Sequence, residues 1–209
     1  GGRLKITLED AGSRLNLNAL VPIGKTAEES KPKEEAEEFL VQFFEKVLDE
    51  SVDALGGGGY EPREMARNLL DYMDPDDVGI NGKPENVYYS DQTPPYSPAN
   101  GPLLSVDELA LIEGFDARVV KRIKPYVTVF PLLGEVGINV NTAPAHVLAI
   151  LQYGSSGDMR LADEDIVRSI VNRRDRDEIV CTETESDPEH CISLSEVGLG
   201  TGSIFPPTE

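Results

Sequence analysis

Tryptophan is absent from this sequence, and histidine and cysteine each occur only twice. Two histidines leave little material for a Ser-His-Asp or Cys-His catalytic arrangement. Four consecutive glycines occupy residues 56–59, but the Lys-Ser/Thr pair that a phosphate-binding loop requires does not follow them, so a connector is the simpler interpretation. No run approaches the ~20 apolar residues of a membrane-spanning helix. We therefore do not predict an enzyme.

Basic residues are also scarce, because 19 Lys and Arg stand against 38 Asp and Glu, giving a net charge of −19. Nucleic-acid affinity depends mainly on Lys and Arg displacing counterions from phosphates, so this charge disfavours nucleic-acid binding. Anionic lipid surfaces are disfavoured for the same reason. The natural complements are divalent cations and basic protein surfaces, although acidity can also serve solubility alone.

The two cysteines, Cys181 and Cys191, lie ten positions apart. In an oxidising compartment they are expected to form one disulfide around a short acidic loop, with a stabilisation of about 2–3 kcal/mol. Two free buried thiols, or half of a zinc site with His190, are the alternatives. A zinc site needs two further ligands, and His146 is the only other histidine.

The periodicity predicts strands first and helices afterwards. Leu4, Ile6 and Leu8, followed by Leu15 and Leu17, alternate across a turn at residues 12–13, which predicts a β-hairpin or two short strands over 3–20 with one face buried. From about 34 to 50 the apolar period becomes helical. Pro62 suits the first turn of a second helix.

Two similar helical units are predicted next. The first begins with a capping box formed by Ser105 and Glu108 and turns at residues 113–116. In the second unit Thr142 is expected to cap one helix and Asp163 another. Both units are similar to helix–hairpin–helix modules, which bind nucleic-acid phosphates, but acidic residues stand in the first hairpin where a phosphate would lie.

Two acidic loops are the candidate metal sites, because Ca²⁺ prefers six to eight oxygen ligands on flexible loops. Neither loop matches an EF-hand, and the first can also be interpreted as a simple helix end followed by a turn. Asp71 lies one turn before the first loop. The predicted calcium ligands are Asp74, Asp76 and Asp77 in the first loop and Glu183, Glu185 and Asp187 in the second, which the cysteines enclose.

Five stretches, taken in order, resemble the K-type minor pseudopilin family of type II secretion systems (the general secretion pathway protein K family). They are LEDAGSRLNLN at 8–18, LDYMDPD at 70–76, YSPANGPL at 96–103, SVDEL at 105–109 and GINVNTAPAHVL at 137–148. The last is the most specific of them, and the order and spacing of all five together carry the resemblance.

The resemblance implies an α+β fold in which a large inserted α-helical domain interrupts a small pseudopilin-like β-sheet scaffold. We expect the first scaffold strands in residues 1–32, the inserted domain with its two helix–hairpin–helix-like units in 33–190, and a return to the scaffold in 191–209 that continues beyond the present sequence. The resemblance also implies an N-terminal membrane helix that precedes this sequence, and calcium and a disulfide are in keeping with the family.

The function implied is that of a non-enzymatic structural subunit at the tip of the periplasmic pseudopilus, supporting protein export. Its expected partners are the I and J minor pseudopilins, with other pseudopilins and secreted substrates as further candidates. Its expected location is the bacterial inner membrane, with the soluble domain in the periplasm. The alternatives are a helix–hairpin–helix nucleic-acid-binding protein and a calcium-dependent hydrolase with a cleft of convergent carboxylates.

Overall fold

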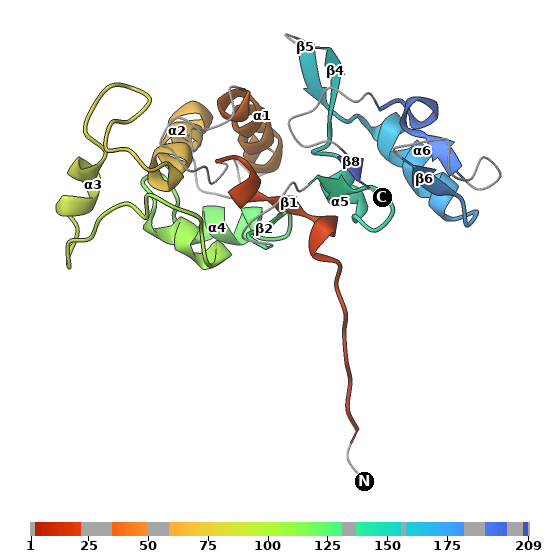
Figure 1. The fold of residues 1–209 in the computed structure, drawn as a ribbon, viewed down its shortest axis with the longest axis horizontal. Coiled ribbons are helices and arrows are strands. Elements are labelled where there is room, and N and C mark those ends of the chain that lie inside the picture. Colours follow the sequence, from red (N-terminus) through yellow and green to blue (C-terminus); the bar gives the residue numbers. More distant parts are fainter. Residues whose placement is uncertain are drawn as a thin grey trace.

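The computed structural model describes residues 3–21, 35–49, 59–130, 137–155, 158–181, 191–199 and 207–208. It is a mixed fold of helices and short strand pairs (Figure 1). The α-helices are α1 (Ala36–Asp49), α2 (Pro62–Met73), α3 (Asn86–Ser90), α4 (Ala117–Ile123), α5 (Ala145–Leu148) and α6 (Glu164–Arg174). The 3-10 helices are η1 (Ala11–Ser13), η2 (Leu17–Ala19), η3 (Val106–Leu111) and η4 (Leu194–Val197).

The strands form pairs rather than a single sheet. Three pairs are parallel, namely β1 (Leu15–Asn16) with β2 (Val127–Thr128), β3 (Ile138–Asn139) with β8 (Pro207–Thr208), and β6 (Ile179–Cys181) with β7 (Cys191–Ser193). The fourth pair, β4 (Gln152–Ser155) with β5 (Asp158–Leu161), is antiparallel. Each parallel pair joins segments that are separate in the sequence, so these pairs tie the chain together over long range.

Helices α1 and α2 pack side by side and provide the most aromatic part of the core (Figure 1). The helical period predicted for residues 34–50 is confirmed, and its stripe is almost completely buried in Phe39, Leu40, Phe43, Phe44 and Val47. Pro62 lies in the first turn of α2, as predicted. Here it loses no hydrogen bond, because the first N–H groups of a helix have no partner within the helix.

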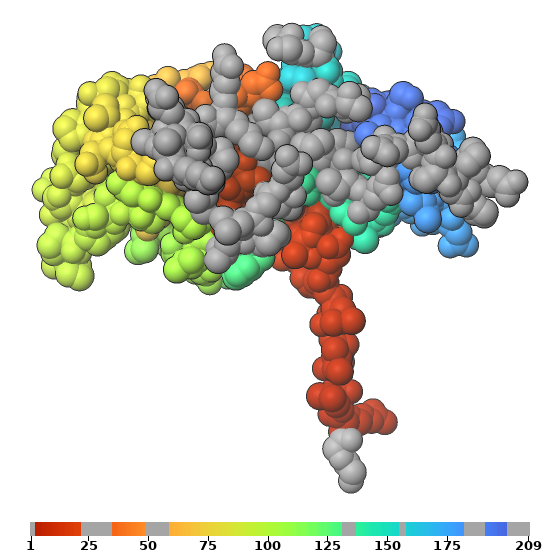
Figure 2. All heavy atoms as spheres, in the orientation of Figure 1, coloured from red at the N-terminus to blue at the C-terminus, as the bar shows by residue number. Residues whose placement is uncertain are grey.

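The β-hairpin predicted for residues 3–20 is wrong. Residues 3–10 extend away from the body (Figures 1 and 2), and Leu4, Ile6 and Leu8 are 86%, 72% and 91% exposed. The turn at 12–13 exists as part of η1, but β1 then pairs with β2 from far along the chain. Alternation identifies a strand with one apolar face, but it does not identify the strand's partner.

Asn18 joins three segments at the centre of the first half of the fold. Its side chain is buried, and its amide nitrogen donates to the carbonyl oxygens of Leu103, at 2.9 Å, and Val129, at 2.8 Å. Its oxygen accepts from the backbone N–H of Leu103 at 2.8 Å. One side chain thus satisfies three buried backbone groups for which these short strands provide no ladder partner.

The two helical units are present, with different internal geometry from that predicted. The capping box of Ser105 and Glu108 is confirmed, although the element it begins is the 3-10 helix η3. Asp163 caps α6 as predicted. In the second unit the β4–β5 hairpin separates α5 from α6, and Gly154 within β4 has a φ of +123° opposite Met159.

The cap predicted at Thr142 is wrong. Helix α5 begins after Pro144 without a side-chain cap, and the hydroxyl of Thr142 donates to Asp10 instead. Pro144 rather than Thr142 occupies the N-cap position of α5, so Thr142 lies two residues before the place from which a side chain caps the helix. The described residues share one hydrophobic cluster from Leu15 to Leu199. The predicted division into scaffold and inserted domain, at 32/33 and 190/191, stays a prediction.

We expect Asn18→Ala to lower the free energy of unfolding by about 3 kcal/mol, because it leaves three buried backbone groups without partners. Urea denaturation followed by circular dichroism measures this change. Asn172→Ala, at an exposed position of α6, is the matched control and should change stability by less than about 0.5 kcal/mol. Equal effects of the two substitutions would contradict the role assigned to Asn18.

Candidate metal centre

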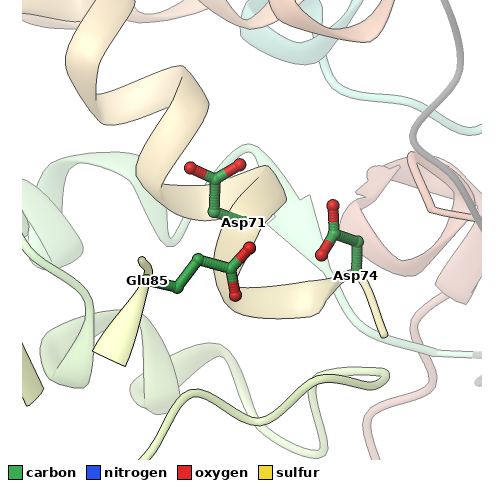
Figure 3. Close-up of side chains that lie close together, drawn as sticks. All are labelled: Asp71, Asp74 and Glu85. Atoms are coloured by element: carbon green, nitrogen blue, oxygen red, sulfur yellow. The ribbon is translucent and has the colours of Figure 1, made fainter. Parts of the chain in front are cut away.

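Three carboxylates converge where α2 ends and α3 begins (Figure 3). Asp71 lies in the last turn of α2, Asp74 follows its end, and Glu85 immediately precedes α3. One oxygen from each lies within 4.8 Å of the other two, so all three can reach a single ion. We call Asp71, Asp74 and Glu85 the carboxylate cluster.

The loop from 74 to 85 folds back on itself and so brings Glu85 to the end of α2. The backbone N–H of Gly79 donates to the carbonyl of Lys83 at 2.9 Å, and Val78 forms a β-bridge with Pro84. Gly82 makes the turn with a φ of +76°, which glycine adopts without strain. The Ile80 N–H donates to Asp71 at 3.0 Å, which holds this small hairpin against α2.

Gly79 is required by the close approach of the loop to α2. A Cβ atom at this position would lie 2.7 Å from Oδ2 of Asp71, closer than such atoms approach in proteins. Glycine therefore lets the backbone pass directly over the carboxylate. A larger residue would force either the Asp71 carboxylate or the loop to shift.

The carboxylate cluster is buried and short of hydrogen-bond donors. Asp71 and Asp74 are only 7% and 6% exposed, and Glu85 is half-buried. Within the described part of the chain, Oδ1 of Asp74 and both side-chain oxygens of Glu85 have no hydrogen-bond partner. Buried polar atoms in native proteins nearly always have a partner, so these oxygens need either a proton or a cation.

Burial and repulsion from neighbouring carboxylates raise the pKa of each carboxyl group in the cluster. Burial, followed by the charges of Asp76 and Asp71, raises the pKa of Asp74 to about 7. Burial, followed by the charges of Asp74 and Asp71, raises the pKa of Glu85 to about 8. Burial also raises the pKa of Asp71. A bound cation would reverse these shifts, because it stabilises the ionised forms.

The donor set suits a hard divalent cation. Three carboxylates offer up to six oxygens, and Ca²⁺ takes six to eight oxygens in flexible geometry. Asp74, Asp76, Gly79 and Glu85 have the spacing of positions 1, 3, 6 and 12 of a calcium-binding loop. The match is partial, since Val78 occupies the fifth position and the positive φ falls at Gly82 rather than Gly79.

Of the six predicted metal ligands, the structure places Asp74 in the cluster. Asp76 accepts from the Val78 N–H at 2.8 Å, and Asp77 lies 3.5 Å from the amide of Asn100. Glu183, Glu185 and Asp187 fall outside the described residues. The prediction omitted Asp71, although it noted its position, and missed Glu85. The twelve-residue spacing from Asp74 to Glu85 was the available signal.

A groove of about 530 Å³ opens beside the cluster, between α2 and the segment that carries α3. Its lining is rich in acidic and aromatic side chains, including Glu64, Asp71, Glu85, Tyr88, Tyr89 and Glu113. Asp71 and Glu85 thus line the groove, although both carboxylate oxygens of Glu85 are closed to solvent.

The disulfide between Cys181 and Cys191 is present, with Cα atoms 5.4 Å apart. It joins β6 to β7 at the two ends of the acidic loop. Asn141 supports β6 from the other side, since its amide nitrogen donates to the Val180 carbonyl and its oxygen accepts from the Val180 N–H, both at 2.9 Å. The zinc alternative is excluded for these cysteines, because their sulfurs are bonded to each other.

The shifted pKa values predict that the metal-free chain loses stability as the pH rises. A carboxyl group with a raised pKa binds more protons in the folded state than in the unfolded state, so ionisation between about pH 4 and 8 disfavours folding. With chelator present, Asp74→Asn should stabilise the chain by about 1–3 kcal/mol at pH 8 and by much less at pH 5.

Denaturant unfolding at the two pH values tests this prediction. Asp77→Asn is the matched control, because it removes one negative charge from an exposed position of the same loop. If both substitutions stabilise equally at pH 8, general charge repulsion rather than the buried cluster is responsible.

Comparison with known proteins identifies relatives of one kind. The chain is 32% identical over 152 residues to the type II secretion system protein K of Aeromonas hydrophila, covering 72% of this chain and 44% of that protein. It is 28% identical over 206 residues to the protein K of Pseudomonas aeruginosa, covering 98% and 53%. The chain thus spans about half the length of the curated relatives it matches.

The fold also has a counterpart among solved structures. It aligns with a chain in the crystal structure of the GspK-GspI-GspJ complex from enterotoxigenic Escherichia coli with a TM-score of 0.50 and 24% identity. The alignment covers 68% of this chain and 46% of that chain. At this identity the likeness establishes a shared fold.

A family model gives the most direct assignment. The model described as type II secretion system (T2SS), protein K, matches residues 13–132, which is more than half of the chain. This range includes α1 to α4 and the whole carboxylate cluster. The chain belongs to the type II secretion system protein K family.

Proposed function

We propose that the chain is part of a K-type minor pseudopilin, a structural subunit at the tip of the periplasmic pseudopilus that supports protein export. The match of residues 13–132 to the protein K family carries this proposal. The relative of similar fold comes from a complex with GspI and GspJ, so the I and J minor pseudopilins are the proposed partners. Other pseudopilins and secreted proteins are further candidates.

The proposed role is non-enzymatic and does not include nucleic-acid binding. A net charge of −19 opposes a phosphate backbone, and the first helical unit places Asp116 in its hairpin, where it caps α4 by accepting from the Arg118 and Val119 N–H groups. In a nucleic-acid-binding hairpin, backbone N–H groups of this kind would be available to phosphate. We propose that the two helical units resemble helix–hairpin–helix modules in shape but do not bind nucleic acid.

We propose that residues 3–9 supply the first strand of the pseudopilin scaffold. They are extended, and Leu4, Ile6 and Leu8 share one exposed face. Strand β8 lies next to β3, close to the place where residues 3–10 leave the body (Figure 1). In the longer relatives, sequence that follows this point can therefore pair with the exposed strand and cover its apolar face.

The proposed location is the inner membrane with this part in the periplasm. Within the described residues, no helix has both the length and the apolar character needed to cross a bilayer. The membrane anchor that the family resemblance implies is proposed to be an N-terminal helix outside the present sequence.

We further propose that Asp71, Asp74 and Glu85 hold Ca²⁺. Their unpartnered buried oxygens and raised pKa values support this proposal. The ion would supply the positive charge that the cluster lacks, and the residues would fix the end of α2 to the start of α3. The position of α3 and its neighbouring tyrosines on the surface would then depend on the ion.

We expect calorimetry to detect calcium binding, with Asp74→Asn and Glu85→Gln each weakening it by about tenfold or more, since each removes ionised ligands. Calcium should also raise the melting temperature of the unsubstituted chain. Asp77→Asn should weaken binding by less than about threefold. Absence of calcium-dependent heat and stabilisation at millimolar calcium, or equal weakening by Asp77→Asn, would refute the assignment.

Assembly is tested by mixing the chain with I and J minor pseudopilins of a type II secretion system and measuring mass by light scattering after gel filtration. We expect a complex with one copy of each subunit that forms more weakly in chelator, because metal loss frees α3. A gel shift with duplex DNA at low salt is the comparison experiment. DNA binding without pseudopilin assembly would favour the helix–hairpin–helix alternative.

A further inference from the structure

A single carboxylate, that of Asp10, connects the projecting N-terminal segment to the second half of the chain. Its Oδ2 accepts from the hydroxyl of Thr142 at 2.6 Å and from the amide of Asn139 at 3.1 Å. Its Oδ1 accepts from the backbone N–H of Gly12 at 2.9 Å, which closes η1. We call Asp10, Gly12, Asn139 and Thr142 the entry junction.

The entry junction is long-range in sequence and specific in chemistry. Asp10 and Thr142 are 132 residues apart, so no local preference creates their contact. The carboxylate receives three donors, and the hydrogen bond from Thr142 is the first cause of a pKa of Asp10 below its ordinary value. Asp10 is therefore ionised at neutral pH, and charge-assisted hydrogen bonds of this kind are the stronger ones.

The turn at Gly12 brings the N-terminal segment close enough for these bonds. A Cβ atom at Gly12 would lie 3.3 Å from Oδ1 of Asp10 and 3.7 Å from Cβ of Asn139. The absence of a side chain lets η1 pack directly against Asn139. The Ser13 N–H and hydroxyl both bond to the Asp10 carbonyl, at 3.1 and 2.7 Å, which makes the turn compact.

Asn139 also belongs to the strand pair at which the C-terminal segment returns. In the β3–β8 register its partner is Thr208. Its side-chain oxygen accepts from the Asn141 N–H at 2.9 Å, so its amide nitrogen is directed toward Asp10. The incoming segment, the centre of the chain and the returning strand therefore meet around one residue.

We propose that Asp10 is a positioning residue that, through Thr142 and Asn139, fixes the direction in which residues 3–9 leave the body. Figures 1 and 2 show that this segment projects from the body at the entry junction. Beyond the junction its side chains Leu4, Ile6 and Leu8 are exposed, so apolar contacts with the body do not set its direction, and the exposed ion pair of Glu9 with Arg14 is tested separately below. A small change in backbone direction at Asp10 therefore moves residue 3 by a larger distance.

The test uses two spin labels, one at the exposed Lys5 and one at the exposed Asn172 on α6, with the native disulfide retained. Pulsed dipolar spectroscopy measures the distribution of distances between them. We expect Asp10→Ala and Thr142→Val each to broaden the distribution, and the double substitution to broaden it no further, because both remove the same hydrogen bond. Thr142→Ser keeps a hydroxyl and should restore the narrow distribution.

Glu9→Gln is the matched control. It removes the neighbouring charge and its exposed ion pair with Arg14 but leaves the entry junction intact, so the distribution should stay narrow. The melting temperatures of all variants should agree closely, because the substituted residues Asp10 and Thr142 are exposed. Amide exchange at Gly12 should rise about tenfold in Asp10→Ala through loss of a charge-assisted bond.

Three results would overturn the proposal. The first is an unchanged distribution in Asp10→Ala with a normal melting temperature. The second is additive broadening by Asp10→Ala and Thr142→Val, which would mean that the residues act independently. The third is broadening by Glu9→Gln equal to that by Asp10→Ala, which would assign the effect to surface charge.

Discussion

Burial of three carboxylates at one point is the constraint on which the surrounding structure depends. Asp71, Asp74 and Glu85 repel one another and have lost water, so the loop between α2 and α3 is stable in this form only if their charge is neutralised. Protons can do this, as the raised pKa values of Asp74 and Glu85 indicate, and so can a divalent cation. We propose the cation as the solution in the native protein, because it would satisfy oxygens for which the described chain provides no donor. Gly79 and the small hairpin around it let the loop pass close to Asp71 and bring Glu85 to the end of α2.

Elsewhere, side-chain amides form the hydrogen bonds to buried backbone groups that neighbouring strands would form in a large sheet. Asn18 binds the backbone at Leu103 and Val129, and Asn141 binds both backbone groups of Val180. Arg174 adds a bond from its guanidinium to the carbonyl of Ala143 at 2.6 Å. These contacts compensate for strands of two to four residues, which leave many buried backbone groups outside any ladder. The fold is therefore specified by a few polar residues as much as by its apolar core.

The sequence predicted what is local and missed what is long-range. The α1 period, the first-turn proline of α2 and the caps at Ser105 and Asp163 each depend on residues within a few positions, and all were correctly inferred. The partner of β1 and the true contact of Thr142 lie more than a hundred residues away, and no periodicity encodes them. The cluster is an intermediate case. Asp74 was predicted from local acidity, whereas Glu85 needed the folding of a twelve-residue loop to reach it.

A crystal structure of the chain grown with calcium would test the central claim, that the carboxylate cluster requires a cation, most directly. The account predicts one ion between α2 and α3, at about 2.3–2.6 Å from side-chain oxygens of Asp74 and Glu85, with an anomalous signal that identifies calcium. The same position filled by water or by a lysine ammonium at millimolar calcium would contradict it. So would carboxylates turned outward to solvent, because the cluster would then carry no buried charge to neutralise.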